Sequence, residues 1–161
     1  MNQQQKDQYF MQKALQEAKV AFEKNEVPVG AIVVSNDKII ARCHNLTETL
    51  NDVTAHAEMQ AITSASNHIG GKYLNDCTMY VTLEPCSHHG VTPPCTSAII
   101  KSKISKVIYS VIDIDKRVKG KTFKILNSKK IKVQPFVLPH YTKVSPQEYE
   151  KYSGDGGYLH N

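Results

Sequence analysis

Long apolar runs and abundant cysteine are both missing from this chain. No stretch approaches the ~18 consecutive apolar residues that a membrane-spanning helix needs, and Met1–Gln5 show no apolar signal region. The chain has 4 cysteines, which do not amount to a disulfide framework and point to a reducing compartment. Cys43 and Cys77 lie in apolar stretches, where we expect small buried residues. These absences predict a cytoplasmic protein without a membrane segment.

The sequence also lacks internal repeats and low-complexity linkers. Its 161 residues suffice for one domain of ordinary size, which buries about two thirds of the unfolded chain's surface without a disulfide. After Pro139 the sequence is polar and rich in turn-forming residues, including Pro146 and the glycines of 154–157. We predict one functional domain over residues 1–140 and a partly mobile tail over 141–161.

Hydrophobic periodicity predicts helices that alternate with strands. Apolar residues recurring at three and four positions predict an amphipathic helix over Asp7–Asn25. Two strand-like runs, Val29–Val34 and Ile39–Cys43, meet through the turn-forming Ser35–Lys38 and predict an antiparallel hairpin. Further helices are predicted at His56–Ser66, Pro94–Lys101 and Lys121–Asn127, and further strands at Met79–Leu83, Lys106–Ile112 and Ile131–Val137. This order predicts an α/β fold, a three-layer α/β/α sandwich with a mixed sheet of about five strands.

His56, Glu58, Cys86 and Cys95 carry most of the chemical information in the sequence. One imidazole and two thiolates suit zinc, and three protein ligands leave a fourth position where a water loses its proton near neutral pH. Glu58 is not needed as a ligand and can carry that proton. Residues two apart in a helix face nearly opposite sides, so His56 and Glu58 can converge only at a helix's first turn. The pattern predicts a zinc enzyme.

A structural zinc site is the alternative that the residues leave open. Closed structural sites want four ligands, often as CxxC pairs, whereas eight residues separate Cys86 from Cys95. His88 and His89 lie in this interval and could supply a fourth ligand, contact a substrate or relay protons. In this alternative the chain is a non-catalytic, zinc-stabilised binding module and Glu58 is incidental.

The run His56-Ala57-Glu58, followed by Thr82–Cys86 and then Cys95, resembles the cytidine-deaminase-like superfamily of zinc-dependent deaminases. The resemblance implies that His56, Cys86 and Cys95 bind Zn2+ and that Glu58 is the catalytic proton carrier. It also implies a homodimer that replaces an exocyclic amine of a nucleobase-type ring by oxygen and releases ammonia.

Below the superfamily level, the two parts of the chain resemble different families. From Tyr9 to Cys86 the chain is similar to bacterial tRNA adenosine deaminases, notably at Glu26–Ala31, Asn45 and Asp52–Met59. This resemblance implies that Asn45 contacts the base and that Val29 lies at the substrate. Without it, Asn45 would be read as an ordinary turn residue. The N-terminal part therefore favours adenosine in tRNA, or a related nucleoside, as the substrate.

From Cys86 onward the chain resembles the pyrimidine deaminase of riboflavin biosynthesis, in the Cys86–Cys95 segment and at Gly120-Lys121. That family acts on a phosphoribosylated diaminopyrimidine, and the resemblance favours His88 as a substrate contact. The chain departs from it at Val91, where that family usually carries arginine or lysine, a residue suited to a phosphate. The riboflavin-pathway reaction is therefore the alternative to the tRNA reaction.

Positive charge is concentrated in one part of the chain. The net charge is +5, and eleven of the 20 lysine and arginine residues lie between Lys101 and Lys132, against only Asp113 and Asp115. Such a cluster is typical of a surface that binds the phosphates of tRNA, although an ordinary solvated face has the same composition. Few aromatic residues are interleaved with these lysines, whereas stacking on bases favours such an arrangement.

Overall fold

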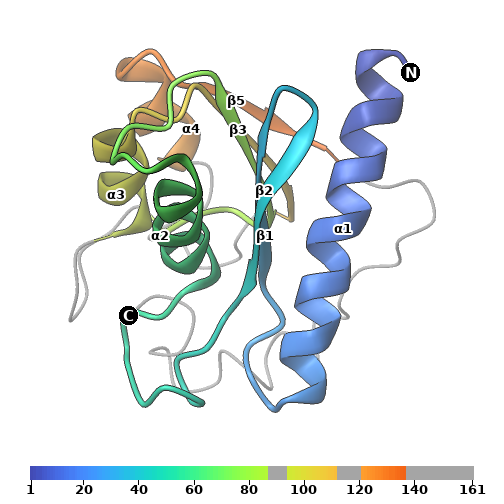
Figure 1. The fold of residues 1–161 in the computed structure, drawn as a ribbon, viewed down its shortest axis with the longest axis vertical. Coiled ribbons are helices and arrows are strands. Elements are labelled where there is room, and N and C mark those ends of the chain that lie inside the picture. Colours follow the sequence, from blue (N-terminus) through green and yellow to red (C-terminus); the bar gives the residue numbers. More distant parts are fainter. Residues whose placement is uncertain (87–93, 112–120, 137–161) are drawn as a thin grey trace.

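A five-stranded mixed sheet forms the centre of the computed structural model, which describes residues 1–86, 94–111 and 121–136 (Figure 1). The strand order is β2-β1-β3-β4-β5, with β1 antiparallel to both β2 and β3, and with β3, β4 and β5 parallel. The strands are β1 (Gly30–Ser35), β2 (Lys38–His44), β3 (Cys77–Leu83), β4 (Lys106–Val111) and β5 (Lys132–Pro135).

Helices cover both faces of the sheet (Figure 1). One face carries α1 (Gln3–Glu23), and the other carries α2 (Ala57–Ile69), α3 (Cys95–Ser102) and α4 (Lys121–Ser128). Within the described residues, one hydrophobic core lies on each face of the sheet. The smaller core joins α1 to the sheet through Phe10, Met11, Ile32 and Tyr80, and the larger core lies under the other three helices. The predicted three-layer α/β/α sandwich with a mixed five-stranded sheet is confirmed.

The first helix begins four residues before its predicted start at Asp7. Asn2 caps it, since the Asn2 side chain accepts a hydrogen bond from the Gln5 N–H at 2.8 Å. The Gln5 side chain in turn accepts from the Asn2 N–H at 2.9 Å, which completes a capping box. Apolar periodicity could not reveal this turn because the residues at 2–5 are all polar.

The predicted hairpin between β1 and β2 is confirmed. Asn36 and Asp37 both have positive φ angles, 51° and 62°, and a turn of this kind matches the right-handed twist of the two strands it joins. The α2 helix continues three residues past the predicted Ser66, to Ile69, and ends at the left-handed Gly70. The predicted strand ends at Ile112 and Val137, and the predicted tail over 141–161, lie outside the described residues.

A buried carboxylate ties α1 to the sheet. Asp7 is 1% exposed and accepts hydrogen bonds from Tyr80 Oη at 2.7 Å and from Gln3 Nε2 at 2.8 Å. Burial of the phenol raises the pKa of Tyr80, so its hydroxyl remains a donor to Asp7 at any ordinary pH. This pair fixes the N-terminal end of α1 on β3.

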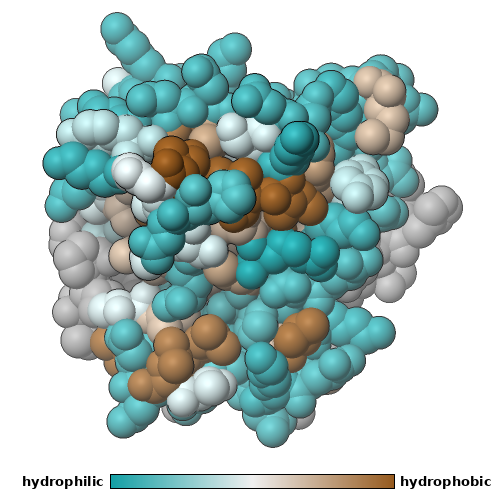
Figure 2. All heavy atoms as spheres, in the orientation of Figure 1, coloured by the Kyte–Doolittle hydropathy of each residue, from teal (hydrophilic) through white to brown (hydrophobic). Residues whose placement is uncertain are grey.

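The face of the molecule seen in Figure 2 is largely hydrophilic, with separate small hydrophobic patches. Among the described residues, no helix combines the length and the apolar character that crossing a bilayer requires.

Gly30 is the point of closest approach between α1 and β1. A Cβ atom at this position would lie 2.0 Å from the carbonyl oxygen of Ala14 and 2.6 Å from the backbone nitrogen of Ala18. Both are backbone atoms of a helix, which cannot turn away as a flexible side chain could. Gly30 therefore allows α1 to pack directly on β1, next to Val29.

We expect Gly30→Ala to lower the free energy of unfolding by at least about 2 kcal/mol, because the added methyl group overpacks a rigid contact. Gly71→Ala is the matched control, since a Cβ there meets nothing within 4 Å, and it should change stability by no more than about 0.5 kcal/mol. Denaturant unfolding of both variants measures the difference. Equal stabilities would show that α1 can retreat from β1.

Candidate active site

His56, Cys86 and Cys95 come together from three segments of the chain. His56 immediately precedes α2, Cys86 follows the end of β3, and Cys95 opens α3. Their candidate ligand atoms all lie within 4.8 Å of one another, and all three residues are buried. The structure thus assembles the predicted metal-binding group across 39 residues of sequence.

The first turn of α2 explains how His56 and Glu58 can share a site. His56 has extended backbone angles, φ −69° and ψ 154°, and is the residue just before the helix, whereas Glu58 lies in its first turn. The change of backbone conformation between them turns both side chains to the same pocket. His56 and Glu58 therefore converge at the start of a helix, as the sequence predicted.

Hydrogen bonds from Cys95 stabilise a negative charge on Cys86. The Cys95 N–H donates to Cys86 Sγ at 3.0 Å, and α3 directs its positive N-terminal end toward the same sulfur. Donation by the Cys95 thiol, then by the His56 ring and by this backbone N–H, lowers the pKa of Cys86 to about 4 against the opposing effect of burial. The same thiol contact raises the pKa of Cys95. The two sulfurs thus share one proton, which a bound cation would displace.

The three residues fit a zinc ion. In tetrahedral coordination, with Zn–S about 2.3 Å and Zn–N about 2.0 Å, neighbouring ligand atoms lie about 3.5–3.8 Å apart. His56 Nδ1 lies 3.4 Å from Cys95 Sγ, close to that spacing. His56 Nε2 is buried and has no hydrogen-bond partner within the described ranges. No hydrogen bond through that atom therefore holds the ring in place.

A small pocket adjoins this group. It is lined by Val29, Asn45, His56, Glu58, Leu83, Glu84 and Cys86. The predicted substrate contacts Asn45 and Val29 therefore lie beside the metal-binding group, while the predicted contact His88 lies outside the described residues. Sequence reasoning gave Leu83 and Glu84 no role. Their position directly before Pro85-Cys86, at the end of a strand, is the signal that could have identified them.

Burial gives Glu58 the properties of a proton carrier. The residue is 5% exposed, and this burial is the main reason why the pKa of its carboxyl group is raised above its usual value. A carboxyl group so raised both accepts and returns a proton more readily near neutral pH than an exposed glutamate would.

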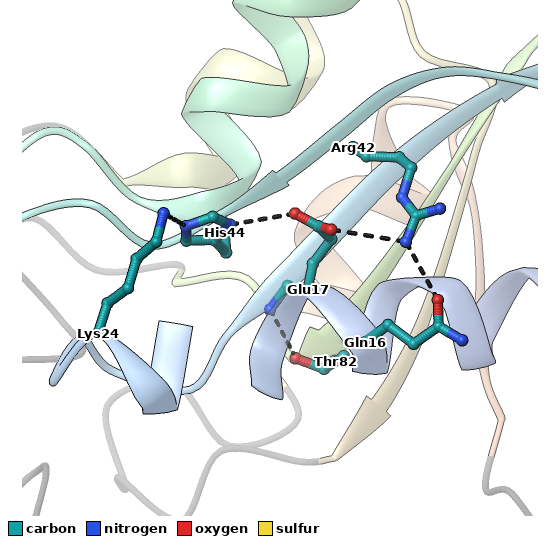
Figure 3. Close-up of polar contacts among 7 residues, drawn as sticks. Gln16, Glu17, Lys24, Arg42, His44 and Thr82 are labelled. Atoms are coloured by element: carbon teal, nitrogen blue, oxygen red, sulfur yellow. Dashed lines mark hydrogen bonds and ion pairs between the residues drawn. The ribbon is translucent and has the colours of Figure 1, made fainter. Parts of the chain in front are cut away.

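Polar contacts join the C-terminal part of α1 to the end of β2 (Figure 3). Glu17 accepts from His44 Nδ1 at 3.0 Å and pairs with the Arg42 guanidinium at 3.5 Å. Lys24 Nζ lies 3.2 Å from His44 Nε2, and since an ammonium can only donate, Nε2 is the acceptor and Nδ1 carries the proton. The contacts fix the residue that immediately precedes Asn45.

Two further hydrogen bonds fix residues next to the pocket, one from the sheet and one from a helix. Thr82 Oγ1 accepts from the Gly30 N–H at 3.0 Å, which fixes β1 to β3 beside Val29 (Figure 3). Thr122, at the start of α4, donates its hydroxyl to the Pro85 carbonyl at 2.5 Å. The residue before Cys86 is thus anchored by a helix that comes much later in the sequence.

The lysine cluster predicted from the sequence is divided by the fold. Parallel pairing places Lys106 of β4 beside Thr78 at the start of β3, whereas the pocket residue Leu83 closes β3. Five residues of strand separate these ends by about 16 Å. At the end of the sheet away from the pocket lie Lys101, Lys103, Lys106, Lys129, Lys130 and Lys132. Lys121 is at the pocket end, next to Thr122.

Comparison with known proteins also indicates a zinc-binding site in this chain. Residues 4–111 match the family described as the cytidine and deoxycytidylate deaminase zinc-binding region. The chain is 52% identical over 106 residues to a tRNA-specific adenosine deaminase of Aquifex aeolicus, an alignment that covers 66% of each chain. It is 40% identical over 132 residues to the tRNA-specific adenosine deaminase of Bacillus subtilis, covering 82% of this chain and 78% of that one.

Solved structures from two groups share the fold. One, from a study of A-to-I editing by tRNA:A34 deaminases, is 35% identical, has a TM-score of 0.67, and covers 80% of this chain and 91% of its own. The other, RibD of Acinetobacter baumannii, is 30% identical with a TM-score of 0.72 and covers 98% of this chain, which spans only 40% of RibD. With the family match over residues 4–111, this chain belongs to the cytidine and deoxycytidylate deaminase family of zinc-binding proteins.

Proposed function

We propose that this chain is a zinc-dependent hydrolytic deaminase that converts adenosine to inosine in tRNA. The observation that carries the proposal is the pocket itself, which brings Asn45 and Val29 against Glu58 and the metal-binding group. The tRNA-specific adenosine deaminases of Aquifex aeolicus and Bacillus subtilis support the choice of substrate.

In this proposal His56, Cys86 and Cys95 would hold zinc, which would supply the Lewis acidity that makes a water nucleophilic near neutral pH. Glu58 takes the proton from that water and returns it to the departing amine, a double role that its raised pKa favours. Water adds at the amine-bearing ring carbon while the neighbouring ring nitrogen takes one of its two protons. The bond to the exocyclic nitrogen then breaks, the second proton leaves with the amine as ammonia, and a ring carbonyl remains.

Asn45 and Val29 form the substrate side of the pocket. The Asn45 amide offers both a donor and an acceptor, which suits the edge of a purine ring. Val29, which is 7% exposed, offers an apolar surface against the ring. Both residues precede the metal-binding group in sequence, so this wall belongs to the part of the chain that resembles tRNA adenosine deaminases.

The riboflavin-pathway reaction is the second candidate. It is favoured by the RibD structure, which matches 98% of this chain against 80% for the A-to-I editing enzyme. It is disfavoured by Val91, where a phosphate-binding residue is absent.

The tRNA partner and the cellular location of the protein are proposed from the sequence and the relatives. Lys121 lies near the pocket and is available to a tRNA backbone, whereas most described lysines of the 101–132 cluster lie at the other end of the sheet. Lys116, Arg117 and Lys119 lie outside the described residues. A homodimer remains an expectation from the family resemblances, and a cytoplasmic location remains a prediction from the sequence.

We expect Glu58→Gln to keep its zinc and to lose between about a hundredfold and ten-thousandfold in kcat, the usual contribution of general acid–base catalysis. Ammonia release measures turnover, and elemental analysis measures zinc. The amide has the same shape as the carboxylate but cannot carry the proton. Full turnover by this variant would contradict the assigned mechanism, whereas zinc binding without turnover in both the wild type and the variant would favour a zinc-stabilised binding module.

We expect Cys86→Ser to lose zinc, because a hydroxyl is a poor replacement for a buried thiolate ligand. Cys43→Ser is the matched control, since Cys43 is half-buried on β2 and is not part of the metal-binding group. Zinc per chain, measured after dialysis, should fall only in Cys86→Ser. Zinc should also be released on acidification, since protons compete for the ligands. Equal zinc contents would remove Cys86 from the ligand set.

The substrate is tested by ammonia release from a panel with the zinc-loaded protein. The panel holds a tRNA anticodon stem-loop with adenosine at the wobble position, free nucleosides and bases, and the phosphoribosyl diaminopyrimidine. We expect release only with the RNA, accompanied by inosine in the product. The apparent affinity should fall as salt rises, since phosphate contacts release counterions. Release only with the pyrimidine would establish the riboflavin-pathway reaction instead.

A further inference from the structure

Residues 45–56 connect the substrate side of the pocket to its metal side. The segment runs from the end of β2 to the start of α2, and its two end residues, Asn45 and His56, both line the pocket. At its base the Leu46 N–H donates to the Ala55 carbonyl at 2.9 Å, which closes the segment into a loop. The conformation of this loop therefore determines how Asn45 is presented to a ligand beside His56.

Glu26 holds the loop from within the protein. Its side chain is fully buried, and its carboxylate accepts hydrogen bonds from the Glu48 N–H at 2.8 Å, the Thr49 N–H at 3.0 Å and the Thr49 hydroxyl at 3.1 Å. Its own N–H donates to the Ala21 carbonyl at the end of α1 at 2.9 Å. Glu26 is thus a fixed acceptor, anchored on a helix, against which the loop is built.

The hydrogen-bonding pattern is that of a helix cap. Two successive backbone N–H groups point to one carboxylate, and the Leu50 N–H then donates to the Leu46 carbonyl at 2.9 Å, as in a single helical turn. Among the residues that the structure describes, Glu26 has these donors and no cation as partners. The buried charge therefore depends on the loop, and the loop depends on it.

The capped turn continues directly to Asn45. Thr47 Oγ1 accepts a hydrogen bond from Asn45 Nδ2 at 2.9 Å, and the Asp52 N–H donates to the Thr47 carbonyl at 3.0 Å. Because the two ends of an amide have opposite hydrogen-bonding roles, the bond to Thr47 fixes which polar atom of Asn45 a ring in the pocket meets.

His56, at the other end of the loop, has anchors of its own. Its carbonyl accepts from the Gln60 N–H at 3.0 Å within α2, and its ring lies against Cys95. Loss of the Glu26 cap should therefore disturb Asn45 much more than the metal-binding group.

We infer that Glu26 is a positioning residue, which caps the turn at 47–51 and through Thr47 orients Asn45 toward the substrate. The inference rests on the proposed function for the identity of the substrate, but the chain of hydrogen bonds does not depend on it. Glu26 should consequently control how well the substrate binds and leave the proton transfer at Glu58 unchanged.

The test compares Glu26→Gln and Thr47→Val in the zinc-loaded full-length chain, with the anticodon stem-loop as substrate. Glu26→Gln replaces one acceptor oxygen by an NH2 group that faces two N–H donors. Thr47→Val keeps Glu26 and removes only the acceptor of the Asn45 bond. Each variant should raise KM about tenfold, the effect of losing one well-placed hydrogen bond, while kcat and zinc content stay within about twofold. If Glu26→Gln does not fold, Thr49→Val takes its place, since it removes only the hydroxyl that donates to the Glu26 carboxylate.

A double-mutant cycle with Asn45→Ala then tests whether Glu26 acts through Asn45. Once the Asn45 side chain is absent, adding Glu26→Gln should raise KM no further, because residues that work through one contact are not additive. Increases in KM that multiply would overturn the inference.

Asp7→Asn is the matched control, because Asp7 is another buried carboxylate held by two donors, on the α1 face away from the pocket. It should lower the thermal stability and leave KM unchanged. A rise in KM equal to that of Glu26→Gln would mean that any loss of stability produces the effect, and would overturn the inference.

An NMR readout separates this inference from the proposed function. The side-chain NH2 resonances of Asn45 should shift in Glu26→Gln and in Thr47→Val, and should stay in place in Asp7→Asn. If the wild type forms no inosine in the stem-loop, the proposed function fails, and the Asn45 resonances still decide the role of Glu26. Unchanged resonances in both variants would overturn that role.

Discussion

Keeping a thiolate and a carboxylate buried side by side is the constraint on which this structure depends. Cys86 and Glu58 are each 5% exposed, and removing an ion from water costs several kcal/mol unless other groups compensate. The Cys95 N–H and thiol compensate Cys86, and α2 and α3 both begin at the cluster, so their dipoles add positive potential there. Zinc supplies the remaining compensation, which links metal binding to folding.

The sheet topology makes this compensation possible. β3 ends at the pocket, and the crossovers that follow parallel strands return the chain so that helices on one face begin at the same edge. The sulfur ligands lie on this parallel side, between β3 and α3. Asn45 and Val29 belong to the antiparallel side, where the contact of α1 with Gly30 and the polar contacts around His44 hold the strands. His56 and Glu58 follow β2 on this antiparallel side as well, so the pocket is assembled where the two halves of the sheet meet.

Much of this arrangement could be predicted from the sequence, because periodicity and ligand spacing are local signals. The strands, the helices and the group of His56, Cys86 and Cys95 were predicted close to where the structure has them. The start of α1 was not, since a capping box in a polar segment has no hydrophobic period. Glu26 was identified only as part of a resembling motif, because its partners are backbone N–H groups 22 and 23 residues away, which no side-chain pattern reveals.

The spatial distribution of the lysines also could not be predicted from the sequence. Counted along the chain, the lysines of the 101–132 cluster form a single basic segment, but the fold places most of the described ones at the end of the sheet away from the pocket. Electrostatic attraction to a phosphate backbone falls off within about 10 Å at moderate salt, less than the length of β4. Those lysines therefore contribute little electrostatic attraction at the pocket. In the proposed function, specificity therefore comes from groups at the pocket edge, and the orientation of the Asn45 amide matters more to substrate choice than the total charge.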